Sequence, residues 1–468
     1  MKTKKMSLLT LTLVSSSLVT SVRNLTTIAE TQMKMLFFVA IAAIFFFIPT
    51  ALVSAELATG WPEKGGVYSW VKHAFGKKWG FFSSWLQWVY CQIGVVSTLY
   101  FFASTLAYII DPALSTNKIF IAIVCLLAVW VFTGVNLLGQ NVSSLVSSLG
   151  FTFGVLTPAV LIISLGIIYM FLGDPIQMDT SFTFDNILPD FGKVSTLVLL
   201  LGFIRAFGGI EVAACHANSV ENPKRNFPIS ILIVVIFGIC VNVFGAMAVG
   251  FAIPRDKINL MAGLIAAFHD FLEVFHIGFF TPVLGILIIF GACASIASWL
   301  MGPIKGLAST SEDGGLPPFL CKTNKHGAYS TLLIFQGCII SLISIFLLFL
   351  PNLNLAFWTS VALAMTMYTV MYALLLLAGI RLRYSQPHVE RKYKIPFGNV
   401  GIWVVVVLGL ITLVIAFALN FIPPAEFPIN PYKYTGSLIV LALIFYAIPA
   451  FINYHRKDSW KVTKKSKD

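Results

Sequence analysis

Long apolar runs dominate this chain and recur twelve times along its 468 residues. A helix of about 20 apolar residues crosses about 30 Å of hydrocarbon, and only helices and closed barrels satisfy their backbone groups in lipid. Residues 231–237 and 404–417 are apolar almost without interruption, whereas barrel strands alternate between lipid and lumen. The sequence therefore predicts an all-α polytopic membrane protein with twelve transmembrane helices. The predicted spans are 6–30, 33–58, 81–110, 119–138, 143–172, 194–218, 227–252, 277–304, 328–350, 355–380, 400–422 and 435–454.

The composition agrees with a membrane protein and excludes soluble classes. Only 11% of residues are charged, whereas a soluble domain has about 25%. The seven cysteines form no CxxC or Cys/His pattern typical of a disulfide framework or a zinc site. A net charge of +12 would suggest nucleic acid in a soluble chain, but here it fits cytoplasmic loops that face anionic lipid. We expect no cofactor, no metal and no nucleic acid partner, and the oligomeric state stays open.

The basic residues predict the orientation. With the N-terminus inside, the cytoplasmic segments, Lys305 among them, carry 23 of the 31 Lys and Arg, and the opposite loops carry 6. Short loops rich in Lys and Arg stay in the cytoplasm. We therefore expect a multi-pass protein of the cell inner (cytoplasmic) membrane with both termini cytoplasmic. The first 22 residues also resemble a signal peptide, but no clear cleavage motif follows and its loss would leave eleven spans, so we interpret them as part of the first helix.

Two predicted spans, the first and the sixth, carry polar interruptions at mid-depth. The residues concerned are Arg23 and Asn24 in a Ser/Thr-rich stretch, and Arg205, Gly208, Gly209 and Glu211. Such interruptions are tolerated only where the backbone is buried in protein or lines a cavity. If helices 1–5 and 6–10 are two repeats, both breaks hold equivalent positions, which indicates a binding site at the membrane midplane. The alternative is that both are small-residue packing faces.

Three charged residues favour a binding site over packing alone. Each mid-membrane charge costs about 2.5–3.5 kcal/mol and persists when it is paired or functional. Arg23 and Arg205 outnumber Glu211, so an anionic substrate group would complete the charge balance through paired hydrogen bonds. Glu211 could pair with either arginine, and a simple helix clamp is the alternative interpretation. Glu211 is also a candidate for proton transport or pH sensing, or for a fixed counter-charge, depending on whether burial or a nearby arginine dominates.

Other candidates are less specific. Trp299 lies in the eighth span, and Tyr368 and Tyr372 lie at i and i+4 on one face of the tenth. By themselves these aromatic residues are more typical of packing than of a gate. Glu56 lies near a predicted helix end, where contact with water is the plain interpretation. The stretch 61–80 could be a re-entrant or interfacial segment or an amphipathic connector.

Four motifs and a tyrosine pair carry a family resemblance. They are IPTALVSAELATGWPEKGGVYSWV, LPDFGKVSTLV, GGIEVAACHANSVENPKRNFP, IASWLMGP and the pair Tyr368 and Tyr372. In this order along nearly the whole chain they resemble the amino acid–polyamine–organocation (APC) superfamily, and within it the glutamate/GABA antiporter branch. The resemblance implies a LeuT-like 5+5 inverted repeat with discontinuous helices 1 and 6, plus helices 11 and 12. It implies one transmembrane transporter domain over residues 1–454, with repeats at about 6–172 and 194–380, helices 11 and 12 at about 400–454, and a short basic cytoplasmic tail at 455–468.

The same resemblance implies the site and the function. Arg23 and Asn24 would lie at the helix 1 break, Gly209 and Glu211 at the helix 6 break, and Trp299, Tyr368 and Tyr372 near the transport path. In the acid-resistance branch an acidic residue occupies the position of Ser295, so substrate identity and pH gating are not transferred. We expect an amino acid antiporter that exchanges a glutamate-like or zwitterionic amino acid for a related amino acid or GABA. Proton- or cation-coupled symport in the same fold is the alternative. An enzyme or a channel is disfavoured because no catalytic constellation or filter-like repeat is visible.

Overall fold

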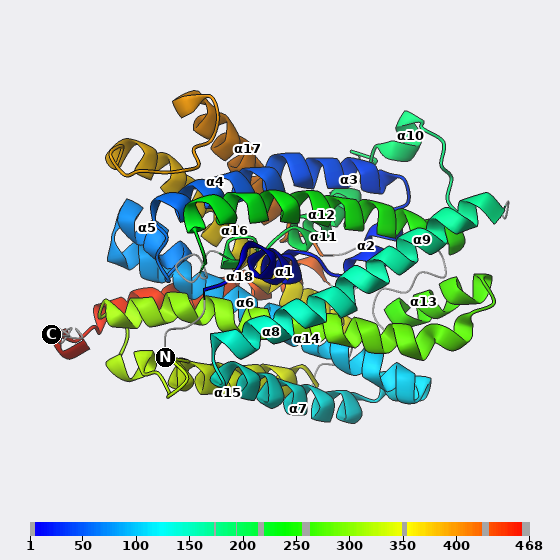
Figure 1. The fold of residues 1–468 in the computed structure, drawn as a ribbon, viewed down its shortest axis with the longest axis horizontal. Helices are drawn as coiled ribbons and strands as arrows, with labels where there is room; N and C mark the ends of the chain where they lie inside the picture. Colours follow the sequence, from blue (N-terminus) through cyan, green and yellow to red (C-terminus); the bar gives the residue numbers. More distant parts are fainter. Residues whose placement is uncertain are drawn as a thin grey trace.

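The computed structural model describes residues 5–172, 175–192, 194–213, 220–254, 263–348, 353–423 and 430–460, and these ranges are mostly helical and contain no strand. The helices of the first half are α1 (Leu8–Val19), α2 (Asn24–Ala29), α3 (Lys34–Ala42), the π-helical turn η1 (Ala43–Phe47), α4 (Ile48–Gly60), α5 (Val67–Phe75), α6 (Lys77–Ile110), η2 (Pro112–Thr116), α7 (Lys118–Leu137), α8 (Gln140–Phe151), η3 (Thr152–Leu156), α9 (Thr157–Leu172) and α10 (Phe184–Ile187). Those of the second half are α11 (Val194–Ala206), α12 (Pro223–Ala252), α13 (Gly263–Val274), η6 (Gly278–Phe280), α14 (Thr281–Glu312), η7 (Pro318–Cys321), α15 (Ser330–Leu348), α16 (Leu353–Ser385), α17 (Gly398–Leu419), α18 (Pro431–Tyr454) and η8 (Asp458–Trp460). Figure 1 shows α5 at one end of the molecule and α10 and α13 at the opposite end.

Helices long enough to cross a membrane make up most of the described chain. Nine helical segments within the described ranges have the necessary length and apolar composition. They are Lys34–Gly60, Lys77–Ile110, Lys118–Leu137, Gln140–Leu172, Arg225–Ala252, Gly278–Glu312, Val361–Ser385, Gly398–Leu419 and Pro431–Tyr454. Three shorter apolar helices, Leu8–Val19, Thr196–Ala206 and Ser330–Ile345, fall in the first, sixth and ninth predicted runs. The prediction of a helical multi-pass membrane protein is confirmed, and the number of twelve crossings stays a prediction.

The first predicted span is interrupted, as its polar residues indicate. Helix α1 ends at Val19, Thr20 is extended with φ −106° and ψ 128°, and α2 begins at Asn24. In the sixth span α11 ends at Ala206, and the chain then turns from Phe207 to Glu211. The predicted end of this span falls on residues 214–219, which lie outside the described residues. Both described breaks coincide with the polar clusters of the sequence.

Close backbone contacts hold the central helices together. Helix α14 packs extensively against α6, α8 and η3. A Cβ on Gly154 of η3 would collide with the backbone of Gly291 in α14, so only glycine permits this approach. Small residues at helix contacts are typical of membrane bundles. Large apolar side chains such as Leu127 on α7 and Val414 on α17 are exposed on the outside, as expected for a surface that faces lipid.

The stretch 61–80 contains a short helix, and its two interpretations, a re-entrant or interfacial segment and an amphipathic connector, stay predictions. Helix α5 begins after Gly66 and ends at Gly76, packs against α6, α14 and α16, and is too short to cross a bilayer. Lys72 of this helix pairs with Asp313 after α14 at 3.0 Å. These contacts fix the connector to the end of α14.

Charged groups outside the spans have shifted pKa values at this connector. The hydrogen bond from His73, at 2.7 Å, lowers the pKa of Glu63, while burial opposes the shift. Burial also acts against ionisation of Asp313, but hydrogen bonds from Tyr68 and Lys72 outweigh it and lower the pKa of that carboxyl. Both carboxylates therefore favour the charged form in this packed arrangement.

Two expectations about charged residues were wrong. Lys305, counted with the cytoplasmic loops, lies inside α14 at 7% exposure, and its Nζ donates to Gln140 Oε1 at 3.0 Å. Glu56, expected to reach water, is 3% exposed and forms ion pairs with Arg383 and Arg391. In both cases the residue lies near a helix end in sequence, but neighbouring elements cover it.

Candidate substrate site

The two helix breaks lie against each other. Gly209 has a φ of +112°, a conformation that residues with a Cβ rarely adopt. A Cβ at this position would lie 2.8 Å from the carbonyl oxygen of Leu18, near the end of α1, and 3.0 Å from the ring of Trp299 in α14. Glycine is therefore needed where the chain after α11 meets the end of α1.

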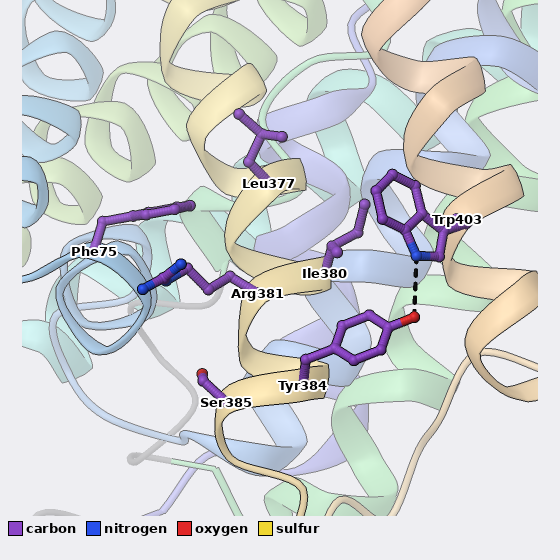
Figure 2. Close-up of a pocket in the computed structure, with 7 residues that line it drawn as sticks. All are labelled: Phe75, Leu377, Ile380, Arg381, Tyr384, Ser385 and Trp403. Atoms are coloured by element: carbon purple, nitrogen blue, oxygen red, sulfur yellow. Dashed lines mark hydrogen bonds between the residues drawn. The ribbon is translucent and has the colours of Figure 1, made fainter.

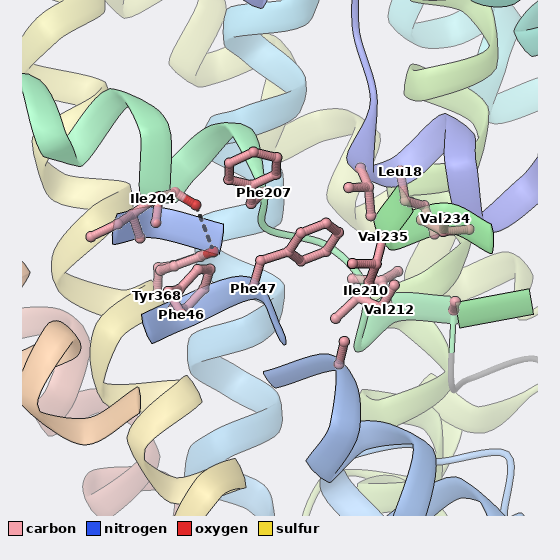
Figure 3. Close-up of a cluster of buried hydrophobic side chains, with 14 of the residues drawn as sticks. Leu18, Phe46, Phe47, Ile204, Phe207, Ile210, Val212, Val234, Val235 and Tyr368 are labelled. Carbon is pink, nitrogen blue, oxygen red and sulfur yellow. Dashed lines mark hydrogen bonds between the residues drawn. The ribbon is translucent and has the colours of Figure 1, made fainter. Parts of the chain in front are cut away.

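Apolar side chains enclose this junction. Phe207 stacks on Phe47 of η1 with ring centroids 4.9 Å apart. Figure 3 shows these two rings together, with Ile210 and Leu18 on the side of the break and Tyr368 on the side of α16. The enclosure removes water from most of the break, which strengthens polar interactions inside it.

Glu211 is fully buried at this break and accepts hydrogen bonds from neutral groups. The hydroxyls of Tyr90 in α6 and Tyr372 in α16 both donate to its carboxylate, and Gln87 Nε2 donates at 3.4 Å. The Tyr372 hydroxyl also accepts from the Gly209 N–H at 3.0 Å. Hydrogen bonds to an ionised acceptor are stronger than neutral ones. The carboxylate therefore ties the break to α6 and α16.

No ion pair joins Glu211 to an arginine in the part of the chain that the structure describes. The sequence left open a pairing with either Arg23 or Arg205, and neither pairing occurs here. The physical reason is the turn after Ala206, which directs the Glu211 side chain toward α6 and α16, where three donors are available. Whether Glu211 carries a proton during transport stays a prediction.

The predicted aromatic residues gather around the same break. The rings of Tyr368 and Tyr372 lie 4.5 Å apart, and Tyr90 lies edge-on to Tyr368 at 5.3 Å and to Trp299 at 6.0 Å. The Tyr368 hydroxyl donates to the carbonyl oxygen of Ile204 at 3.3 Å. A Cβ on Gly208 would collide with the Tyr368 hydroxyl. The two tyrosines on one face of α16 therefore contact both glycines of the break.

The two arginines contact α6 about two turns further along the helix than Glu211 does, so the site has two levels, one at Tyr90 and one at Ser97. Arg205 Nη2 donates to Ser97 Oγ at 3.2 Å, and Arg23 Nη1 lies 3.4 Å from both Ser97 Oγ and Thr98 Oγ1. The Arg23 guanidinium also lies over the ring of Phe101, 5.8 Å from its centroid. Two like charges that share one hydroxyl repel each other, and a bound anion would relieve this repulsion. This level is the cationic part of the site.

Gly94 of α6 lies between the two levels. Ser97 follows Tyr90 by seven residues, which is about 10 Å along a helix. Gly94 lies between them on the same face, and a Cβ on Gly94 would meet no described atom within 4 Å beyond its own helix. Gly94 is half-buried, whereas Tyr90 and Ser97 are buried. Along α6, Gly94 therefore lies between the contacts with Glu211 and the contacts with the two arginines.

Most predicted site residues are brought together, and α6 supplies partners that were not predicted. Asn24 begins α2, and within the described ranges its side chain makes no hydrogen bond to either level. The residues missed lie in the third span and are Gln87, Tyr90, Gly94, Ser97 and Phe101, joined by Thr98. Their spacing of three, four, three and four places the first five on one helix face. This stripe of polar, small and aromatic residues on one face is the sequence pattern from which their place at the candidate site could have been predicted.

Interrupted helices around buried charges, inside an apolar helical bundle, define the class of this protein as a membrane transporter. Comparison with known families agrees. The family model of amino acid permeases matches residues 6–448, so the chain belongs to the amino acid permease family of the APC superfamily.

Similar proteins cover nearly the whole chain. A transporter of Legionella pneumophila, described as uncharacterized, is 35% identical over 447 residues, which is 95% of this chain and 96% of the relative. A glutamate/gamma-aminobutyrate antiporter of Lactococcus lactis subsp. lactis is 32% identical over 464 residues, 98% of this chain and 92% of the relative. The protein of the same name from subsp. cremoris is 32% identical over 465 residues, with the same shares.

Proposed function

We propose that this protein is an amino acid antiporter that exchanges glutamate or a glutamate-like amino acid for a related amino acid or GABA. The convergence of Arg23 and Arg205 on Ser97, one level away from Glu211, carries this proposal. Glutamate has two carboxylates and one ammonium, and the site offers two guanidiniums and one carboxylate. The names of the two Lactococcus relatives support the same substrate pair.

The substrate binds in the space beside Gly94. One carboxylate pairs with Arg205 and the other with Arg23, since a guanidinium binds a carboxylate through two parallel hydrogen bonds. The ammonium group of the substrate faces the carboxylate of Glu211, to which Tyr90 and Tyr372 donate hydrogen bonds. Trp299 and Tyr368 border the path, Gly208 and Gly209 allow the break, and Asn24 begins the helix that follows Arg23. Two guanidiniums close to one hydroxyl favour an anionic substrate group over a neutral one.

The topology proposed is twelve crossings in the inner (cytoplasmic) membrane, with both termini cytoplasmic and residues 6–172 and 194–380 as inverted repeats. Helices 11 and 12 occupy 400–454, and the basic tail follows. Two contacts support the proposal that both termini lie on the same side of the membrane. Gln140 Nε2 contacts Met6 Sδ at 3.5 Å, beside Lys305 in the last turns of α14, and Arg456 Nη2 donates to the carbonyl oxygen of Asp313, just after α14, at 3.4 Å. Alternating access would then expose the site to each side in turn.

Counterflow in proteoliposomes tests this function. Vesicles are loaded with single amino acids or amines, and uptake of radiolabelled glutamate is measured for wild type, Arg205→Ala and the control Lys433→Ala. Lys433 is an exposed cation outside the site. We expect uptake only with an exchangeable substrate inside, and a KM for glutamate about 10–100-fold higher in Arg205→Ala, because a charge-assisted contact contributes about 1.5–3 kcal/mol.

Three outcomes separate the alternatives. Uptake that needs an ion gradient and no internal amino acid indicates the symporter. No exchange with any amino acid contradicts the proposed function. If Arg205→Ala raises the KM equally for glutamate and for substrates with one carboxylate, Arg205 contributes to general substrate binding and does not bind the second carboxylate.

A further inference from the structure

A groove lies on the molecular surface, away from the candidate substrate site. Its floor is one face of α16, its walls come from α5 and α17, and its volume is about 520 Å³ (Figure 2). The lining residues are Phe75, Leu377, Ile380, Arg381, Tyr384, Ser385 and Trp403. The five residues of α16 follow one another at i, i+3, i+4, i+7 and i+8, so they form a continuous stripe on the helix.

The groove contains a fixed cation beside hydroxyl groups. Arg381 Nε donates to the carbonyl oxygen of Ala74 at 2.8 Å, and its guanidinium lies 5.6 Å from the centroid of the Phe75 ring. Within the described ranges no carboxylate lies within ion-pair distance of Arg381, so its charge is available to a ligand. The Tyr384 hydroxyl accepts from Trp403 Nε1 at 3.1 Å, which leaves its own O–H to donate. A guanidinium is typical of phosphate recognition, and the Tyr384 hydroxyl lies on the other side of the groove, beside Trp403 (Figure 2).

The rest of the groove is apolar and continues onto the surface that faces lipid. Leu377 and Ile380 lie one to two turns before Tyr384 and Ser385, so the apolar and polar ends are separated along α16 (Figure 2). Trp403 is 48% exposed, and Val404 and Val407 continue an exposed apolar face along α17. Trp and Tyr are enriched where the hydrocarbon meets the headgroups. A soluble phosphate would use the polar end alone, whereas a lipid would use both.

We propose that this groove binds an anionic phospholipid. The phosphate lies against Arg381, the Tyr384 hydroxyl on the other side of the groove donates to another oxygen of the same lipid, and an acyl chain lies along Leu377, Ile380 and Trp403. The wall supplied by α5 makes the site depend on the connector that is fixed to α14. This inference rests on the geometry of the groove and holds whichever amino acid is transported.

Fluorescence quenching tests the proposal, because Trp403 lies in the groove. The full chain is reconstituted in phosphatidylcholine vesicles that contain a small fraction of brominated phosphatidylglycerol or, separately, of brominated phosphatidylcholine. We expect stronger quenching by the brominated phosphatidylglycerol at equal mole fraction. Trp403→Phe should remove this excess, since it removes the reporter. Arg381→Ala should lower the apparent affinity for phosphatidylglycerol about tenfold, the change expected when one charge-assisted contact is lost.

Two further arms keep the outcome decisive. Tyr384→Phe removes one donor and keeps the hydrogen bond of Arg381 to the backbone, so it reports on the site even if Arg381→Ala is poorly folded. Arg456→Ala is the control, since it removes a cation that does not line the groove. Equal quenching by the two lipids, or an excess that survives both Arg381→Ala and Tyr384→Phe, overturns the proposal. Competition by inorganic phosphate that abolishes the excess would identify a free-anion site and also overturn it.

Discussion

Replacing Tyr372 with Phe removes one oxygen atom and two hydrogen bonds at the break after α11. The hydroxyl donates to the Glu211 carboxylate and accepts from the Gly209 N–H. A hydrogen bond to a charged group contributes about 1.5–3 kcal/mol and a neutral one about 0.5–1.5 kcal/mol. We therefore expect Tyr372→Phe to lower the free energy of unfolding by about 2–4.5 kcal/mol.

Tyr368→Phe is the matched control, because it makes the same change one helical turn away in the same ring stack. The Tyr368 hydroxyl donates a neutral hydrogen bond, at 3.3 Å, to the carbonyl oxygen of Ile204. Its loss should cost about 0.5–1.5 kcal/mol. The difference between the two variants isolates the contact with Glu211 from the packing of the rings.

The free energy of unfolding is measured by detergent titration, followed by intrinsic fluorescence, for both variants and for wild type. The double variant Tyr372→Phe with Glu211→Gln completes a cycle, and its two changes should not add, since the residues contact each other. Equal destabilisation by Tyr372→Phe and Tyr368→Phe, or additivity in the cycle, would refute the inferred role of Glu211 in holding the break.

Three further changes test other parts of the structure. Gly209→Ala should lower the unfolding temperature more than Gly76→Ala. Both glycines have a positive φ (+112° and +91°), but only at Gly209 would an added Cβ also press against Leu18 and Trp299. Equal effects of the two substitutions would contradict the close approach. Ser97→Ala should raise the KM for glutamate more than Thr98→Ala, since Ser97 contacts both arginines and Thr98 only Arg23; the reverse order would argue against convergence on Ser97. Glu63→Gln should lower the unfolding temperature slightly near neutral pH, by the equivalent of about 0.2–1 kcal/mol for an exposed pair. Because the pKa of Glu63 is lowered in the folded state, its stabilisation is complete above its ordinary pKa of 4.5 and is lost as the pH falls through the lowered value; a difference that grows on acidification would refute this sign.

Apolar periodicity and polar interruptions predicted the elements of the fold well. A run such as 404–417 has one stable structure in lipid, so α17 follows from composition alone. The break between Val19 and Asn24 follows from polar groups that a continuous lipid-exposed helix would not carry. Only the resemblance to the superfamily placed Tyr368, Tyr372 and Trp299 near the transport path, and the structure brings them to the break.

The partners of the charged residues did not follow from the sequence. An unwound stretch has no fixed rotation per residue, so the direction of Glu211 after Gly209 depends on which helices surround it. Those helices are α6 and α16, more than 100 residues away in either direction along the chain. The stripe on α6 from Gln87 to Phe101 contains uncharged residues, among them a Gln, a Tyr, a Gly and a Ser. Without the arginines beside them, such residues do not indicate a binding site. Glu56 was misassigned for the same reason, because the arginines that cover it, Arg383 in the last turn of α16 and Arg391 after this helix, are distant in sequence.

The substitution Gly94→Leu tests the central claim, that the substrate lies between the arginines and Glu211. A Cβ at Gly94 would meet no described atom within 4 Å, and leucine favours helix over glycine by about 1 kcal/mol, so we expect the fold to hold. Gly134→Leu in α7 is the control, since a Cβ there also meets no described atom within 4 Å. We expect the Gly94→Leu protein to unfold at or above the wild-type temperature and to exchange no glutamate, while Gly134→Leu keeps the wild-type stability and exchange. Glutamate exchange at the wild-type rate in a folded Gly94→Leu protein would contradict the central claim.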